Sequence, residues 1–191
     1  YLNEAHKKNI KVIIYYNVHA IASSYADQHP EWQQIQDDGG PIEHVYGIDS
    51  SFCINSPWRD EVFTTLKKLA SCGIDGVFFD GPIFFSNTCY CDHCKRLFKE
   101  KYKKEIRPKT KLSALRTGAD WKDLIEFQSD SIVRFLKDSD AILKEADPQL
   151  LFYMNSSTLG ATWPTGRDNR KIISRAPLPS CSRPRQEESQ R

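Results

Sequence analysis

Three short, nearly continuous runs of apolar residues predict the strands of a buried parallel sheet. The runs cover residues 11–18, 74–80 and 150–154, and each is rich in β-branched or aromatic residues. A strand that is buried on both faces has this pattern, because neither face needs polar side chains. Residues 51–55 form a possible fourth, shorter strand.

Helical patterns lie between these runs. A polar helix is expected just before the first run, at about 4–9. A second helix is expected over about 56–71, where Ser56 and Pro57 are residue types favoured at a helix start. A helix rich in basic residues follows at about 92–104, and its charges are expected to form the solvated face of an amphipathic helix.

A longer helix is expected from Asp120 to about Ala146. Its apolar residues recur at helical spacing and form one stripe, made of Leu124, Phe127, Ile132, Phe135, Leu136 and Leu143. Strands that alternate with helices in this way predict the α/β class with a parallel sheet. A complete (β/α)8 barrel takes about 250 residues, so this chain would supply only part of one.

Composition narrows the possible partners. The chain has 191 residues with 27 basic and 25 acidic side chains, a formal net charge of +2. This balance gives no reason to expect nucleic acid or an anionic membrane as partner, and no run of 18 apolar residues is present. Because the chain starts at Tyr1 within a helical pattern, we expect the natural N-terminus to be missing. The oligomeric state stays open.

The composition changes abruptly near Ile173. Residues 174–191 contain almost nothing that a core could bury, so a disordered or non-native tail is expected there. Residues 1–173 are therefore expected to form the folded domain.

Polar residues stand where the apolar runs end, and in parallel α/β folds such positions form the site. Asp80 is the strongest candidate for a catalytic residue, because it follows a buried run and precedes Gly81 and Pro82. Its alternative role is to cap the loop backbone. The candidate substrate-binding residues are Tyr16, Asn17, His19, Asn155 and Trp163. For His19 the alternative is a structural hydrogen bond, and for Trp163 it is a hydrophobic plug.

Three cysteines fall within six residues, as Cys89, Cys91 and Cys94, and this crowding indicates a metal site. Cys53 is the best candidate for a fourth ligand, ahead of His93. Four thiolates leave no open coordination position, so the expected ion is a structural zinc. Unmetallated thiols and disulfides are the alternatives. Thiolate ligands persist best in a reducing compartment, which favours a cytoplasmic location.

Three further features of the sequence give weaker indications of a functional site. Cys72 and Cys181 do not fit the cysteine cluster, and Cys72 is expected to be a small buried residue. The segment 167–170 is expected to be a loop network of charged residues, with a simply solvated loop as the alternative.

The order and spacing of six segments resemble those of a family of bacterial glycosyl hydrolases with a (β/α)8 barrel, related to the α-L-fucosidases. The likeness extends over about residues 1–173. The segments are Lys11–Asn17, His29–Trp32, Cys53–Asp60, Asp75–Gly81, Cys89–Cys94 and Trp163–Arg170.

This resemblance implies roles for the residues already singled out. The three strands would be the third, fourth and fifth of the barrel. Asp80 would correspond to the fourth-strand nucleophile of a retaining α-L-fucosidase. The cysteine cluster is similar to the zinc site of some bacterial β-galactosidases, in which the fourth-strand carboxylate is instead the acid/base.

Retaining hydrolysis needs a second carboxyl group about 5–5.5 Å from the first. Asp49, Glu43 and Asp168 lie on loops, but nothing in the sequence selects one of them. We therefore expect the second acid to come from a later strand, and this chain alone to be inactive. Two other classes stay open: a non-catalytic carbohydrate-binding barrel, and a zinc-knuckle binder of nucleic acid, which the balanced charge disfavours.

Overall fold

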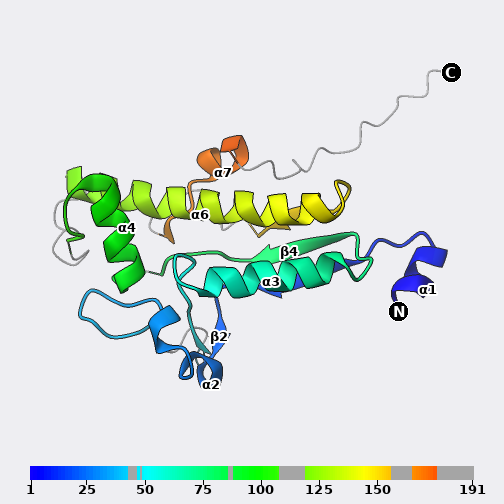
Figure 1. The fold of residues 1–191 in the computed structure, drawn as a ribbon, viewed down its shortest axis with the longest axis horizontal. Helices are drawn as coiled ribbons and strands as arrows, with labels where there is room; N and C mark the ends of the chain where they lie inside the picture. The colour runs from blue at the N-terminus through cyan, green and yellow to red at the C-terminus, as the bar shows by residue number, and fades with distance from the viewer. Residues whose placement is uncertain (43–46, 48, 86–87, 108–118, 156–164, 176–191) are drawn as a thin grey trace.

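A three-stranded parallel sheet organises the fold (Figure 1). The computed structural model describes residues 1–42, 47, 49–85, 88–107, 119–155 and 165–175. The strands are β1 (Ile13–Asn17), β4 (Gly76–Asp80) and β5 (Leu151–Met154), in the order β1-β4-β5. Both pairings are parallel. The expected α/β class is thus confirmed, and each of the three apolar runs contains a strand, as predicted.

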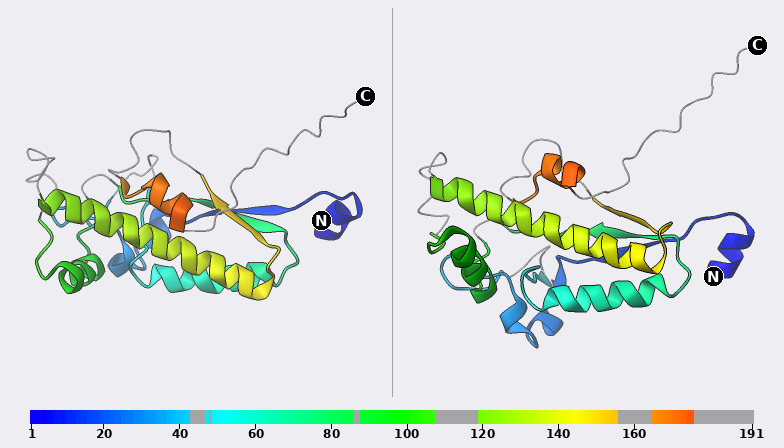
Figure 2. Two further views of the ribbon diagram at one scale, coloured as in Figure 1. Left: turned by 90° about the horizontal axis from the view of Figure 1, so that it is seen from above. Right: turned by 45° about the horizontal axis from the view of Figure 1, so that its top comes forward.

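Two helices pack against one face of this sheet, α3 (Trp58–Ala70) and α6 (Ala119–Ala146), which also lie against each other (Figure 2). Side chains alternate along a strand, and Val77, Phe79 and Phe152 point toward the helices, where each is fully buried. The Phe79 ring lies 5.9 Å from that of Phe135 in α6. All six residues of the expected apolar stripe of α6 are buried.

The other face of the sheet is open over the described part of the chain. The Phe78 ring lies 5.9 Å from that of Tyr15 and 5.1 Å from that of Tyr153, so the three rings cross the sheet in a row. Tyr15 is nevertheless 58% exposed. The expectation that the first strand is buried on both faces is therefore wrong here, because helices cover only one face. In a closed barrel this second face would point inward.

The long segment between β1 and α3 is more ordered than its sequence indicates. It contains α2 (Ser23–Ala26), a 3-10 helix (Pro30–Trp32) and an antiparallel pair made of β2 (Ile21–Ala22) and β3 (Asp49–Ser50). Residues 51–55 do not form the expected strand. Within them Phe52 makes only an isolated bridge to Gln33, and its ring packs among those of Tyr25, Trp32 and Trp58.

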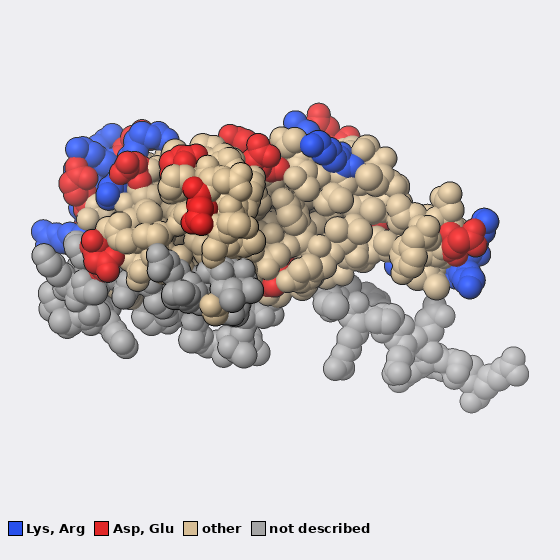
Figure 3. Space-filling view, turned by 90° about the horizontal axis from the view of Figure 1, so that it is seen from below, with Lys and Arg blue, Asp and Glu red and all other residues tan. Residues whose placement is uncertain are grey.

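Three further helices complete the described fold: α1 (Leu2–Lys7), α4 (Asp92–Tyr102) and α7 (Asn169–Arg175). The expected basic helix corresponds to α4, and its charges are partly neutralised by α6. Lys101 lies 2.7 Å from Asp130, and Lys104 lies 2.7 Å from Asp123. Basic and acidic side chains are interspersed on the face shown in Figure 3. The tail expected from residue 174 lies outside the described residues from 176 onward.

No helix in the described ranges has both the length and the apolar character needed to cross a membrane.

Leu136 tests the packing of α6 against the sheet, because it is fully buried. We expect Leu136→Ala to lower the free energy of unfolding by about 2–5 kcal/mol, through lost apolar contact and the cavity that remains. Ile173→Ala is the control, since Ile173 is 72% exposed and the change should cost less than about 0.5 kcal/mol. Urea denaturation followed by circular dichroism measures both. Equal effects of the two changes would contradict the described core.

Candidate active site and cysteine cluster

The parallel register brings three polar residues to the same edge of the sheet. Asn17 is paired with Asp80 at the ends of β1 and β4. Phe79 is paired with Met154, so Asn155 follows β5 beside Asp80. Backbone hydrogen bonds hold this edge, from Val18 N to the Asp80 carbonyl and from Asn155 N to the Phe79 carbonyl, each 3.0 Å long. Asp80 therefore lies in the middle of the row.

The Asp80 carboxylate is held by side chains on both of its oxygens. The Tyr15 hydroxyl donates to Oδ2, and the Asn155 Nδ2 donates to Oδ1. The Nδ1 atom of His19 lies 3.9 Å from Oδ1, and the Asp80 side chain is 23% exposed. A residue that only capped the loop would accept hydrogen bonds from loop N–H groups. The partners seen among the described residues are side chains instead.

His19 supports the backbone of Asp80. It is 3% exposed, and its Nδ1 lies 2.8 Å from the Asp80 carbonyl oxygen. A carbonyl oxygen can only accept, so Nδ1 carries the proton. Gly81 is required beside it, because its φ is +103° and an added Cβ would lie 2.9 Å from His19 Nδ1. This geometry corresponds to the structural role that the sequence left open for His19.

The other residues expected to bind sugar are placed differently. The Asn17 Oδ1 accepts hydrogen bonds from the backbone N–H groups of His19 (3.0 Å) and Ala20 (2.9 Å), so this side chain shapes the turn after β1. Tyr16 faces the helices, with its ring 5.8 Å from that of Phe79, and burial raises the pKa of its phenol. Trp163 lies outside the described residues.

Sequence reasoning missed two residues of this network, Tyr15 and Arg167. Tyr15 lies two positions before Asn17 and so on the same face of β1, a period-two signal that was available in the sequence. Arg167 was expected in a loop network, but it is only 4% exposed. Its Nη2 donates to the Asn155 Oδ1 at 3.1 Å, and its Nε donates to the Pro82 carbonyl at 2.9 Å.

None of the acids considered as a second carboxylate is seen beside Asp80. Asp168 caps α7, since its Oδ1 accepts from the backbone N–H groups of Arg170 (3.0 Å) and Lys171 (3.2 Å). Glu43 and the side chain of Asp49 lie outside what the structure describes.

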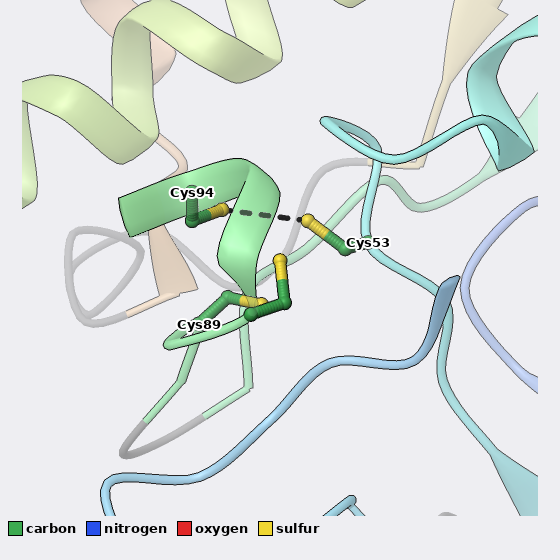
Figure 4. A group of neighbouring side chains, drawn as sticks. Cys53, Cys89 and Cys94 are labelled. Atoms are coloured by element: carbon green, nitrogen blue, oxygen red, sulfur yellow. Dashed lines mark hydrogen bonds between the residues drawn. The ribbon is translucent and has the colours of Figure 1, made fainter. Parts of the chain in front are cut away.

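The four cysteines of the expected metal site come together in the fold, and Figure 4 labels three of them, Cys53, Cys89 and Cys94. The sulfur atoms of Cys53, Cys89, Cys91 and Cys94 all lie within 4.8 Å of one another, and all four residues are buried. The sulfurs of Cys53 and Cys94 are 3.5 Å apart. Zinc–sulfur bonds of about 2.3 Å in a tetrahedron would place the sulfurs about 3.8 Å apart. The cluster therefore has the size of a tetrathiolate site.

Neighbouring groups favour negative charge on part of this cluster, with the pKa of Cys91 lowered and those of Cys53 and Cys94 raised. Asn55 donates from its backbone N to Cys53 and from its Nδ2 to Cys94, both at 3.4 Å. Cys91 occupies the N-cap position of α4 and Cys94 lies in the first turn, where the helix dipole favours anions. Hydrogen bonds from the Cys53, Cys89 and Cys94 thiols lower the pKa of Cys91, whereas burial raises that of Cys53. Four buried thiolates need a cation to balance their charge.

The other cysteines and His93 are not part of the cysteine cluster in the described part of the chain. His93 is not part of the group whose ligand atoms converge. Cys72 is exposed, so the expectation that it is buried is wrong. It follows the last turn of α3, where its sulfur bonds the Lys68 carbonyl at 3.2 Å instead of entering the core. Cys181 lies outside the described residues.

The cysteine cluster belongs to the same loop system as Asp80. The chain from Asp80 to Cys89 leads directly from β4 into the cluster. Gln34, fully buried, connects this segment to the β1–α3 segment: its Nε2 donates to the Ile83 carbonyl at 2.9 Å, and its Oε1 accepts from Phe85 N at 3.1 Å. The segment that follows Asp80 is thus held at several points.

Comparison with known proteins identifies a related family over part of the chain. Residues 1–81 match a family model described as hypothetical glycosyl hydrolase 6. This match includes β1, β4 and Asp80 and confirms the resemblance to glycosyl hydrolases. No curated protein matches the chain.

Several solved glycosidase structures share the fold. An α-L-fucosidase isoenzyme 2 from Paenibacillus thiaminolyticus is 17% identical with a TM-score of 0.65, over 92% of this chain and 24% of that one. A β-galactosidase from Halorubrum lacusprofundi is 18% identical with a TM-score of 0.66, over 91% of this chain and 30% of that one. A β-galactosidase from Marinomonas ef1 is 18% identical with a TM-score of 0.62, over 92% and 31%.

The chain therefore spans about a quarter to a third of the length of these structures. At such identities the likeness concerns the fold alone, an α/β fold with a parallel sheet that these glycosidases share. The family match is to glycosyl hydrolases, and the likeness to an α-L-fucosidase and to β-galactosidases is one of fold.

Proposed function

We propose that this chain is part of a glycoside hydrolase in which Asp80 is a catalytic carboxylate, the nucleophile of a retaining reaction. The observation that carries the proposal is the position of Asp80 at the C-terminal end of the middle strand, with its oxygens held by Tyr15 and Asn155. In barrel enzymes the C-terminal ends of the strands form the active site. The family match over residues 1–81 and the glycosidase folds support the reaction class.

The hydrogen bonds around Asp80 favour the nucleophile over the acid/base role. A nucleophile must be ionised, whereas a general acid must carry a proton at the start of the reaction. Side-chain donors on both oxygens leave neither oxygen placed to give a proton to a leaving group. Tyr15 and Asn155 are such donors, one on each oxygen. The α-L-fucosidase analogy therefore fits this site better than the β-galactosidase analogy.

The second carboxyl group is not supplied by the described residues around Asp80. Because the chain spans only 24–31% of the similar glycosidases, we assign the acid/base to a part of the barrel outside this chain. Because no second acid is seen among the described residues, the second candidate function is a carbohydrate-binding barrel without catalysis. Turnover by the full-length protein separates the two.

A structural zinc ion is part of the proposal. Cys53, Cys89, Cys91 and Cys94 would hold it, and their spacing and burial support four-coordinate binding by sulfur. With all four positions taken by protein, the ion would have no place for substrate. These four cysteines, holding the ion, would fix the segment that runs from Asp80 to α4.

Asp80→Asn in the full-length protein should lower kcat by at least about a thousandfold on nitrophenyl glycosides, because the nucleophile is lost. Asp75→Asn is the matched control. Asp75 precedes the same strand and accepts from Lys11 and Val12, and hydrogen bonding to Lys11 holds its pKa well below the usual range. Its stabilising effect is present at neutral pH and lost in acid. The control should lose stability and keep turnover, and full activity of Asp80→Asn would refute the proposal.

Azide distinguishes the two roles of Asp80. With Asp80→Ala and an activated glycoside, azide should enter from the face vacated by the carboxylate and give a glycosyl azide of inverted configuration. A glycosyl azide of retained configuration would assign Asp80 as the acid/base instead. Proton NMR of the product reads the configuration.

The 191-residue chain alone should show no Asp80-dependent turnover. The reason is the missing second carboxyl group, which retaining hydrolysis requires. Incubation of the purified chain and its Asp80→Asn variant with a panel of nitrophenyl glycosides measures this. Release of nitrophenol by the first protein and not by the second would overturn the assignment of the acid/base to another part of the barrel.

Purified chain should contain about one zinc ion per molecule, measured by mass spectrometry of the metal. Cys94→Ser should lose most of it, because a hydroxyl is a poor replacement for a thiolate ligand. Cys72→Ser should keep it, since Cys72 is exposed and outside the cluster. Equal zinc content in the two variants would contradict the site.

A further inference from the structure

The orientation of the Asn155 amide follows from its neighbours. Two groups approach its Oδ1, the Gly81 backbone N at 3.2 Å and the Arg167 Nη2 at 3.1 Å. Both of these groups can only donate, so the atom that they approach must be the amide oxygen. The Nδ2 is thereby directed to the Oδ1 of Asp80. A flipped amide would oppose donor to donor twice and place its oxygen against a carboxylate.

Arg167 is held firmly enough to impose this orientation. Its side chain is 4% exposed, and its Nε donates to the Pro82 carbonyl at 2.9 Å. The backbone before it is packed against neighbours: Thr165 O accepts from Phe84 N at 3.0 Å, and a Cβ on Gly166 would lie 2.9 Å from both Gln128 and Phe84. The guanidinium thus bridges the segment after β4 and the end of β5.

We propose that Arg167 is a positioning residue for Asp80, acting through the Asn155 amide. Arg167 fixes the amide oxygen, and the amide nitrogen then fixes the Asp80 Oδ1. The catalytic meaning of this relay rests on the proposed function, but the relay itself does not. It adds to the site a residue that acts through Asn155, one of the donors to Asp80.

The relay also makes the two Asp80 oxygens unequal. Oδ1 is held by an amide that is itself fixed by two donors. Oδ2 is held by the hydroxyl of Tyr15, a residue that is 58% exposed on the open face of the sheet. An exposed side chain changes rotamer more readily than a locked amide. In the chain described here, Oδ1 is therefore the more firmly held of the two oxygens.

The side-chain NH2 group of Asn155 reports on the relay directly, by proton–nitrogen NMR of the 191-residue chain. In the unaltered chain, the proton donated to Asp80 should resonate downfield and exchange with water several-fold more slowly than its geminal partner. Asp80→Ala should abolish this difference because the acceptor is gone. Arg167→Met should lower the protection roughly fivefold to tenfold, about the effect of one hydrogen bond.

Tyr15→Phe is the matched control. It removes a donor from the other oxygen of the same carboxylate, so the Asn155 signal should be unchanged. A purely structural role for Arg167 would leave the Asn155 proton protected in any Arg167→Met protein whose backbone spectrum stays folded, and that result would overturn the proposal. If Arg167→Met does not fold, the unaltered chain still decides: an Asn155 NH2 group with two equally unprotected protons rules the relay out.

These NMR measurements need no turnover, so they test the relay independently of the proposed reaction. In the full-length protein, Arg167→Met should lower kcat roughly tenfold with little change in KM, as expected for a residue that positions the nucleophile and does not bind sugar. A protected Asn155 proton in a protein without glycosidase activity would refute the proposed function and leave the relay standing.

Discussion

The parallel register of the three strands is the constraint on which the rest of the site depends. Asn17, Asp80 and Asn155 are far apart in the sequence, and they meet only because β1, β4 and β5 end at the same edge of the sheet. A shift of one residue would turn each of these side chains to the opposite face. The core prevents such a shift, because Val77, Phe79 and Phe152 must all face α3 and α6 to be buried. Burial of the helix-facing residues thus determines where the polar ones point.

The segment after Asp80 shows how a site residue can be fixed from several sides. A strand end alone leaves its carboxylate free to rotate. Here Arg167 approaches from the chain after β5, Gln34 from the β1–α3 segment, and the cysteine cluster from the start of α4. Gln34 and Arg167 are both buried, and their polar groups bond backbone carbonyls that would otherwise be unsatisfied. These contacts therefore stabilise the segment after Asp80 as well as the Asp80 side chain.

Local patterns allowed the three strands of the parallel sheet, the helices α3, α4 and α6, and the convergence of the four cysteines to be predicted, because each leaves a mark in the sequence. An apolar run indicates a strand, and three cysteines in six residues indicate a metal. The apolar run by itself does not distinguish Tyr15 from Tyr16, and only the period-two relation of Tyr15 to Asn17 does so. Arg167 could not be predicted. Its role depends on contacts with Pro82 and Asn155 that form only when the chain folds.

One face of the sheet is open in this chain, which spans only part of the length of the similar glycosidase structures. Tyr15, the donor to Asp80 Oδ2, lies on this face with Phe78 and Tyr153, and it is largely exposed. A complete barrel encloses this face, and hydrogen bonds gain strength when water is excluded from them. The interactions that hold Asp80 should therefore be stronger in a closed barrel than in the chain described here. Under the proposed function, the same closure would bring further strand ends to the rim, and one of them would carry the acid/base opposite Asp80.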